Sequence, residues 1–214
     1  AYDLAKKFTK SQVVAFDLNP ILLLAAKQIA GGLKISAADL SVSPKDSRQP
    51  GQEVELAAPS GAVDNLHFVF GDIYALPFQT SSFDICVSPW LVDILPRRFQ
   101  DLCTSAARVV RPHGVWVNSG SWHFSFANEA ENLSLEEAAE VAGQNGWKPL
   151  LAEQMETPYL QSPFDAHRRF ETLTQFCWER TSQEVASQPP IDDRAEWIRN
   201  PSLPIPPLTE FGDG

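Results

Sequence analysis

The chain has 214 residues, of which 43% are hydrophobic and 21% are charged, as in a globular domain with an apolar core. Its formal net charge of −10 argues against broad binding to nucleic-acid phosphates or to anionic lipid, because both need clustered cations. No apolar run approaches the ~20 residues that span a bilayer and no basic-then-apolar leader opens the sequence, so we expect a cytoplasmic protein.

The first elements alternate between helix and strand. Residues 1–8 place apolar side chains on one side and lysines on the other, as in the second half of a helix. Residues 12–16 form a short apolar, β-branched run that is typical of a buried parallel strand and is followed by Asp17. Asn19, followed by a proline, predicts the start of a helix over residues 21–30.

The middle of the chain begins with an interruption. Residues 36–65 mix prolines, serines, glycines and charges of both signs, which predicts a long insertion loop. Residues 66–70 and 83–87 are typical of two further strands. A helix is expected over 97–110, and another strand over 115–117.

The last part of the chain contains one more helix and one more strand. Ser134 and Glu137 form a capping-box pattern, in which each side chain satisfies a free N–H group at the start of a helix. Residues 170–178 are expected to form the last strand, and prolines in a polar context predict an extended tail or linker over 182–214. The domain therefore covers residues 1–181.

The alternation of strands and helices predicts an α/β fold, a doubly wound and mostly parallel sheet with helices on both faces. The three cysteines lack the spacing of a metal site, so we expect reduced thiols and no metal. In such sheets, ligands bind beyond the carboxyl ends of the strands. The residues that follow each strand are therefore the candidates for a site.

Two carboxylates follow the first two strands. Asp17 could accept hydrogen bonds from both hydroxyls of a ribose, and Asp72 could accept from the amine of adenine while Ile73 packs on the ring. Each acid alone has an ordinary alternative, as a helix N-terminal acid or as a turn residue after glycine. Two acids at neighbouring strand ends favour a nucleoside site.

Three further candidates follow the next two strands. Trp90 offers a flat face that could line a substrate pocket or stack on a cation, with core packing as the alternative. Asp93 lies among apolar residues, so it is either a helix cap or a paired functional group. His123 lies among aromatic residues and could act as a hydrogen-bond partner or a base, with a packed neutral histidine as the alternative.

The motifs in their order resemble a known family. The runs that carry the resemblance are Phe16-Asp17-Leu18-Asn19-Pro20, Gly71-Asp72-Ile73 with Leu76-Pro77-Phe78, Ser82-Phe83-Asp84, and Ala107-Arg108-Val109-Val110-Arg111-Pro112-His113-Gly114. Together they resemble the successive motifs of Rossmann-like, S-adenosylmethionine-dependent class I methyltransferases, over about residues 1–150. The resemblance implies a cofactor site formed by Asp17, Leu18, Asn19, Asp72, Ile73 and Ser88, with Asp17 at the ribose, Asp72 and Ile73 at the adenine and Ser88 near the methyl donor.

A narrower resemblance concerns the substrate. The runs 115–120, 122–124, 133–137 and 146–147, with the long insertion, are similar to the carnosine N-methyltransferase family. That likeness implies that Asp93 and His123 contact a substrate imidazole and that Tyr159 also contributes to the substrate site. The flanks of the aspartate and the histidine depart from the family pattern, which leaves the substrate open.

The resemblance also implies a first strand and a glycine-rich turn, and neither precedes Ala1. We therefore expect a fragment that lacks its first strand and has weak activity or none by itself. The leading prediction is methylation of a nitrogen in a small imidazole- or amine-containing molecule or peptide, without nucleic-acid or membrane partners. The alternatives are a non-catalytic methyltransferase-like binding module and a nicotinamide-dependent oxidoreductase.

Overall fold

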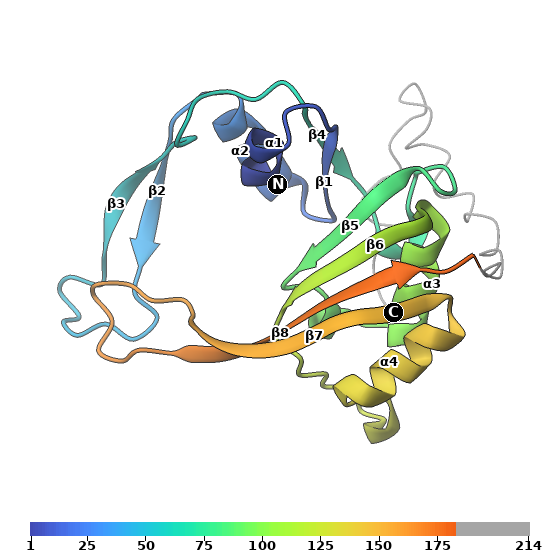
Figure 1. The fold of residues 1–214 in the computed structure, drawn as a ribbon. Coiled ribbons are helices and arrows are strands. Elements are labelled where there is room, and N and C mark those ends of the chain that lie inside the picture. The colour runs from blue at the N-terminus through green and yellow to red at the C-terminus, as the bar shows by residue number, and fades with distance from the viewer. Residues whose placement is uncertain (183–214) are drawn as a thin grey trace, which may run out of the picture.

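The strands within residues 1–182 form three sheets in a mixed α/β fold (Figure 1). The computed structural model describes residues 1–182, so the predicted tail lies outside the described residues apart from its first residue. The strands are β1 (Val13–Asp17), β2 (Ile35–Leu40), β3 (Gly51–Leu56), β4 (Leu66–Phe70), β5 (Phe83–Pro89), β6 (Val110–Gly120), β7 (Trp147–Pro158) and β8 (Phe170–Arg180). The helices are α1 (Tyr2–Lys7), α2 (Pro20–Ala30), α3 (Phe99–Val109) and α4 (Leu135–Gln144), with short 3-10 turns η1 (Ile73–Ala75), η2 (Val92–Ile94) and η3 (Glu129–Glu131).

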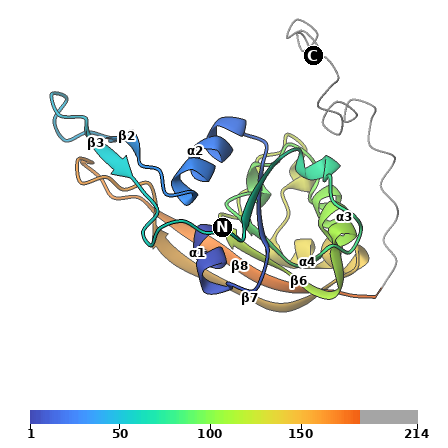
Figure 2. The same cartoon turned by 90° about the horizontal axis from the view of Figure 1, so that it is seen from above.

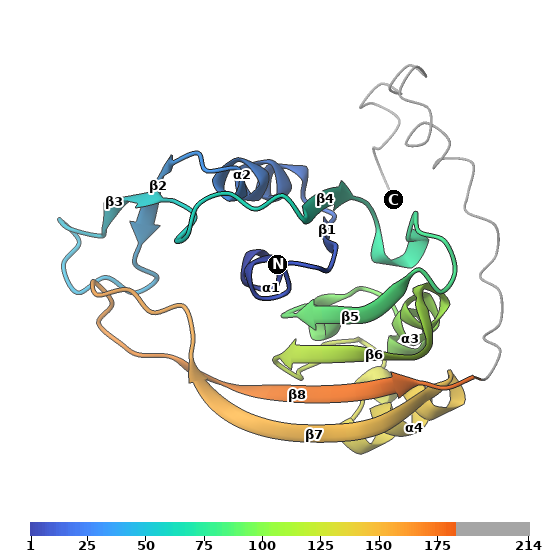
Figure 3. The ribbon, with the colours of Figure 1, turned by 45° about the horizontal axis from the view of Figure 1, so that its top comes forward.

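The sheet topology confirms the predicted α/β class and adds an antiparallel part. β1 pairs with β4 in parallel, and β5 pairs with β6 in parallel. β8 then lies between β6 and β7 and runs antiparallel to both, in the order β5-β6-β8-β7 (Figure 3). Within residues 1–182 no strand pairs with both β1 and β5, so the strands expected in one sheet lie in two.

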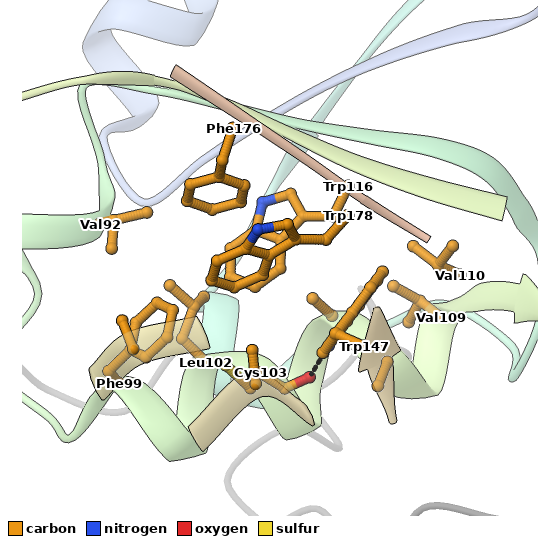
Figure 4. Packing of buried hydrophobic residues seen from close by; sticks show 14 of the residues in the cluster. Val92, Phe99, Leu102, Cys103, Val109, Val110, Trp116, Trp147, Phe176 and Trp178 are labelled. Carbon is orange, nitrogen blue, oxygen red and sulfur yellow. Dashed lines mark hydrogen bonds between the residues drawn. The ribbon is translucent and has the colours of Figure 1, made fainter. Parts of the chain in front are cut away.

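Aromatic side chains form the centre of the main core (Figure 4). Trp116 of β6 and Trp178 of β8 are each 1% exposed, and Phe176 stacks on Trp178 with ring centroids 3.9 Å apart. On the helix side, Trp147 donates from its indole nitrogen to the carbonyl of Cys103 in α3 at 3.0 Å. This packing fixes α3 against the four-stranded sheet and so fixes the strand ends where β5 and β6 stop.

A chain of aromatic rings links the β1–β4 sheet to the four-stranded sheet. Phe78, in the loop after β4, packs edge-on against Phe16 of β1 at 5.6 Å and against Phe83 of β5 at 4.9 Å. Arg108 of α3 holds the same loop by donating to the carbonyls of Leu76 and Phe78 at 2.6 and 2.7 Å. The loop is therefore a fixed connection between β4 and β5.

Both predicted helix caps are present in the structure. The Asn19 side chain accepts from the backbone N–H groups of Ile21 and Leu22 at the start of α2, with Pro20 as its first residue. Ser134 and Glu137 form a complete capping box at the start of α4. The strand prediction was less complete, because the loop expected over 36–65 instead contains the antiparallel hairpin β2–β3. Strand β7 was not predicted, and β6 is longer than the strand expected over 115–117, because it covers Val110–Gly120.

Candidate functional site

The two predicted carboxylates lie at the same edge of the β1–β4 sheet. Asp17 is the register partner of Phe70, and its carbonyl accepts from the N–H of Gly71 at 3.1 Å. Asp72 follows directly, so both acids stand where their strands end. A Cβ on Gly71 would lie 2.9 Å from the Phe16 ring, so glycine is needed for this close approach.

Each carboxylate is oriented by the backbone and keeps acceptor capacity. Asp17 accepts from the N–H of Asn19 at 2.8 Å, and Asp72 accepts from the N–H of Tyr74 at 2.8 Å, in both cases through Oδ1. Among residues 1–182, neither Oδ2 atom has a hydrogen-bond donor in contact. Two such oxygens suit donors such as the hydroxyls of a ribose or an exocyclic amine.

Three neighbours complete this edge. Leu18 is 64% exposed directly after β1, so an apolar side chain is available beside Asp17. The side chain of Asn19 is used in capping α2, and Ile73 is half-buried in the turn after Asp72.

Burial raises the pKa of Tyr74 to about 12, so its phenol stays protonated at neutral pH beneath the guanidinium of Arg97.

Ser88 lies in β5 with its side chain buried. Its hydroxyl is buried and accepts from the indole nitrogen of Trp116 at 2.8 Å while it donates to Oδ1 of Asn118 at 2.9 Å. Asn118 in turn donates to the carbonyl of Thr174 in β8 at 3.2 Å. The Ser88 side chain therefore belongs to the core network of the sheet.

The predicted pair Asp93 and His123 lines one cavity of about 420 Å³. Asp93 comes from the loop after β5 and His123 from the loop after β6, and they share the cavity with Ile94, Leu95, Pro96, Ser125 and Phe126. Ser121 donates to Oδ2 of Asp93 at 2.5 Å, while in the described part of the chain Oδ1 has no donor. The cavity thus combines an oriented carboxylate, an exposed imidazole and apolar walls.

Trp90, the first residue after β5, has an unusual backbone conformation. Its φ of 51° lies in the left-handed region, and its N–H donates to the carbonyl of Ser119 at 3.0 Å. A Cβ on Gly120 would lie 2.9 Å from the Trp90 nitrogen, so the close packing of the two loops needs glycine there. The indole contacts the ring of Tyr159 with centroids 4.5 Å apart, which brings together the two predicted aromatic substrate residues.

Sequence reasoning missed two residues that shape this region, Ser121 and Gly120. Gly120 is the last residue of β6 and Ser121 follows it, so their position at a strand end was an available signal. The hydrogen bond from Ser121 to Asp93 depends on the pairing of β5 with β6, which no local pattern encodes. Burial also raises the pKa of Cys86 to about 11, so this thiol, which packs against the main core, stays protonated at neutral pH.

No helix within residues 1–182 is long and apolar enough to cross a membrane. Comparison with curated proteins found no match. The sequence profile of a family described as a methyltransferase domain matches residues 1–118. The matched part contains β1, β4, β5 and most of β6, together with the loops that carry Asp17, Asp72 and Asp93.

Solved structures of low sequence identity are similar in fold. A S-adenosylmethionine-dependent methyltransferase from Methanosarcina mazei is 14% identical, with a TM-score of 0.55 over 85% of this chain and 86% of that one. A proposed sarcosine dimethylglycine methyltransferase from Galdieria sulphuraria is 12% identical, with a TM-score of 0.55 over 85% and 74%. A 16S rRNA adenine methyltransferase from Catenulisporales acidiphilia is 12% identical, with a TM-score of 0.54 over 87% and 80%.

Proposed function

We propose an acceptor for the methyl group that this chain transfers. The chain belongs to the methyltransferase-domain family and is a methyltransferase that uses S-adenosylmethionine. The proposed acceptor is a nitrogen of a small imidazole- or amine-containing molecule or peptide. One observation carries the proposal: Asp93 and His123, predicted from separate loops, line the same cavity. Family membership also decides against the nicotinamide-dependent oxidoreductase and the non-catalytic module.

The residues at the ends of β1 and β4 fit the cofactor. Asp17 and Asp72 each present one carboxylate oxygen that has no donor among the described residues, as the hydroxyls of a ribose and the amine of adenine require. Leu18 and Ile73 supply apolar contacts beside them. We propose that Asp17 binds the ribose and Asp72 the adenine, and that Asn19 contributes by fixing Asp17 and capping α2. Ser88 would contribute its backbone near the methyl donor.

Methyl transfer asks the protein mainly for position and electrostatics. When bound, S-adenosylmethionine supplies an electrophilic methyl group on a sulfonium. Oδ1 of Asp93 can accept the N–H of a substrate imidazole, which orients the lone pair of the other ring nitrogen for attack. As that nitrogen gains the methyl group, the ring becomes positively charged and the carboxylate stabilises it.

His123 has the complementary task in this proposal. Its ring is exposed at the cavity, and it can accept or donate a hydrogen bond according to its tautomer. After transfer, the proton that remains on the methylated ring can leave to the imidazole of His123 or to water. Trp90 and Tyr159 add flat aromatic faces, which favour a ring or a cation over an aliphatic chain.

The surface charge supports a small acceptor over a nucleic acid. The chain carries 27 acidic and 17 basic residues, so counterion release would contribute little to the binding of a phosphate backbone. A neutral or cationic amine, in contrast, is attracted by an acidic surface. Carnosine is the dipeptide β-alanyl-histidine. Because the sequence resembles the carnosine N-methyltransferases, carnosine is the first acceptor to test.

The test is a methyl-transfer assay with labelled S-adenosylmethionine on the full natural protein, using carnosine, histidine and a simple primary amine as acceptors. We expect turnover of an imidazole compound and a loss in kcat/KM on the order of 10²-fold for Asp93→Asn and for His123→Ala. S-adenosylhomocysteine affinity should change little in both variants, because neither residue belongs to the edge formed by β1 and β4.

His113→Ala is the matched control, because His113 is exposed, pairs with Glu179 and lies near the opposite end of β6. It should keep full turnover. Equal losses for His123→Ala and His113→Ala, or turnover of RNA with none of any small nitrogen compound, would refute the proposed acceptor.

A further inference from the structure

A polar clasp joins two segments that lie far apart in the sequence, with 118 to 124 positions between the residues that pair through a side chain. The tip of the β2–β3 hairpin, residues 41–50, meets the loop 159–169 that connects β7 to β8, as Figures 1 and 2 both show. The N–H of Lys45 donates to the carbonyl of Phe164 at 2.9 Å, and the N–H of Ala166 donates to the carbonyl of Ser43 at 2.7 Å. These bonds extend the hairpin onto the loop as a short antiparallel bridge.

Asp165 is the centre of this clasp. Its carboxylate accepts from the hydroxyl of Ser41 at 2.5 Å, from the N–H of Ser43 at 3.3 Å and from the N–H of Ser162 at 2.8 Å. One carboxylate thus binds both the hairpin and its own loop. The hydroxyl of Ser41 holds the pKa of Asp165 below its usual value, so the charged form is present at neutral pH.

The loop has little else to hold it. Asp165 is the one buried residue in the stretch 159–169, and Leu160 is 59% exposed. Apolar packing therefore contributes little to the position of the loop, and the clasp has to supply it. The hairpin is in the same situation, because Leu40 and Val42 near its tip are 65% and 75% exposed.

The same loop carries Tyr159 to the proposed substrate site. The N–H of Tyr159 donates to the carbonyl of Arg169 at 3.0 Å, and the Arg169 guanidinium lies over the Tyr159 ring at 5.3 Å. Both contacts join Tyr159 to Arg169 at the other end of the loop, next to the rung at which Pro158 of β7 pairs with Phe170 of β8. Its ring packs against Trp90, which shares the loop after β5 with Asp93.

We propose that Asp165 is a positioning residue, through which the β2–β3 hairpin holds Tyr159 against Trp90 and so forms the aromatic wall of the substrate site. The identity of the bound acceptor rests on the function proposed above, whereas the clasp and the aromatic contact do not. The inserted hairpin thereby becomes a determinant of substrate affinity, although it is remote in sequence from the other site residues.

The first measurement follows the aromatic contact without any substrate. The emission of Trp90 is obtained as the difference between the protein and its Trp90→Phe variant, and Tyr159→Leu gives the emission of an uncovered Trp90. In an Asp165→Ala background, the Trp90 emission should shift to the red towards that reference. Asp46→Ala is the control, because Asp46 lies on the same hairpin and, among residues 1–182, its carboxylate pairs with Arg48 alone.

The second measurement separates positioning from general stability. With carnosine as the acceptor, Asp165→Ala should raise KM measurably but by at most roughly tenfold, because the lost hydrogen bonds belong to the clasp and reach the substrate only through Tyr159, with kcat within about twofold. S-adenosylhomocysteine affinity should be unchanged. Ser41→Ala removes one donor only and should show the same pattern at smaller size, which keeps the test open if Asp165→Ala does not fold.

The two proposals fail in distinguishable ways. A protein that does not methylate carnosine contradicts the proposed acceptor, and the Trp90 emission then still decides on Asp165. An unchanged emission in both Asp165→Ala and Ser41→Ala, an equal shift in Asp46→Ala, or an unchanged KM on an acceptor that the protein turns over would overturn the role of Asp165.

Discussion

Replacing Ser88 by alanine separates a core role from a cofactor-binding role. The change removes the acceptor of the Trp116 indole N–H and the donor to Oδ1 of Asn118, both of which are 1% exposed. A buried polar group left without a partner costs about 1–3 kcal/mol, so two of them should lower the free energy of unfolding by about 2–6 kcal/mol. That is a large part of the roughly 5–15 kcal/mol that stabilises a typical domain.

The assay is urea unfolding followed by tryptophan emission. With a slope of about 2 kcal/mol per molar urea, the midpoint should fall by roughly 1–3 M. Ser82→Ala is the control, because Ser82 is exposed at the start of the same strand region and donates only to the carbonyl of Gln79, so its effect should stay within about 0.5 kcal/mol. An unchanged midpoint for Ser88→Ala, together with a large loss of S-adenosylhomocysteine affinity, would show that the hydroxyl faces the cofactor and not the core.

Three further predictions concern a close contact, a titrating carboxylate and a helix cap. Gly120→Ala places a Cβ 2.9 Å from the Trp90 nitrogen, so it should cost about 1–3 kcal/mol and change the Trp90 emission; a Tm and a spectrum like those of the natural protein would contradict the contact. Because the folded pKa of Asp165 is lowered, its contribution is present above the unfolded pKa and is lost as the pH falls through the folded pKa. The urea midpoint of the natural protein should therefore exceed that of Asp165→Asn at pH 6, and the difference should shrink below about pH 4, where a widening difference would refute the assignment. Asn19→Ala should lower stability by about 1 kcal/mol and Asn19→Ser should restore most of it, because serine can also accept from the N–H of Ile21; equal unfolding midpoints would argue against the cap.

The elements that could be predicted from the sequence are those with a local physical cause. β1 and β4 are short apolar runs with their acids at the end, and α2 and α4 begin at side chains that accept from the first free N–H groups. These signals lie within a few residues of one another. They therefore do not depend on contacts with distant parts of the chain.

The elements that escaped prediction depend on distant partners. β7 contains Pro149 and Pro158 and is exposed along most of its length, because it is an edge strand that pairs with β8 alone. The β2–β3 hairpin has few large apolar residues, and its tip is held through Asp165, more than 110 residues later. Neither segment has the local pattern of a buried strand, so both read as loops.

The candidate site shows the same division. Strand ends could be located from the sequence, so Asp17 and Asp72 were placed on one edge and Asp93 and His123 line one cavity. The sequence did not show to which face of the sheet a side chain within a strand points. The hydroxyl of Ser88 points into the core because Trp116 and Asn118 of the neighbouring strand are there to pair with it.

The most direct measurement is the calorimetric affinity of the natural protein for S-adenosylhomocysteine, compared with the Asp17→Asn and Asp72→Asn variants. Each variant should bind at least about tenfold more weakly, because each loses a charged acceptor for a nucleoside hydroxyl or amine. Asp64→Asn, an exposed acid just before the other end of β4, should bind as the natural protein does. Full affinity in both Asp17→Asn and Asp72→Asn would mean that the nucleoside is held elsewhere.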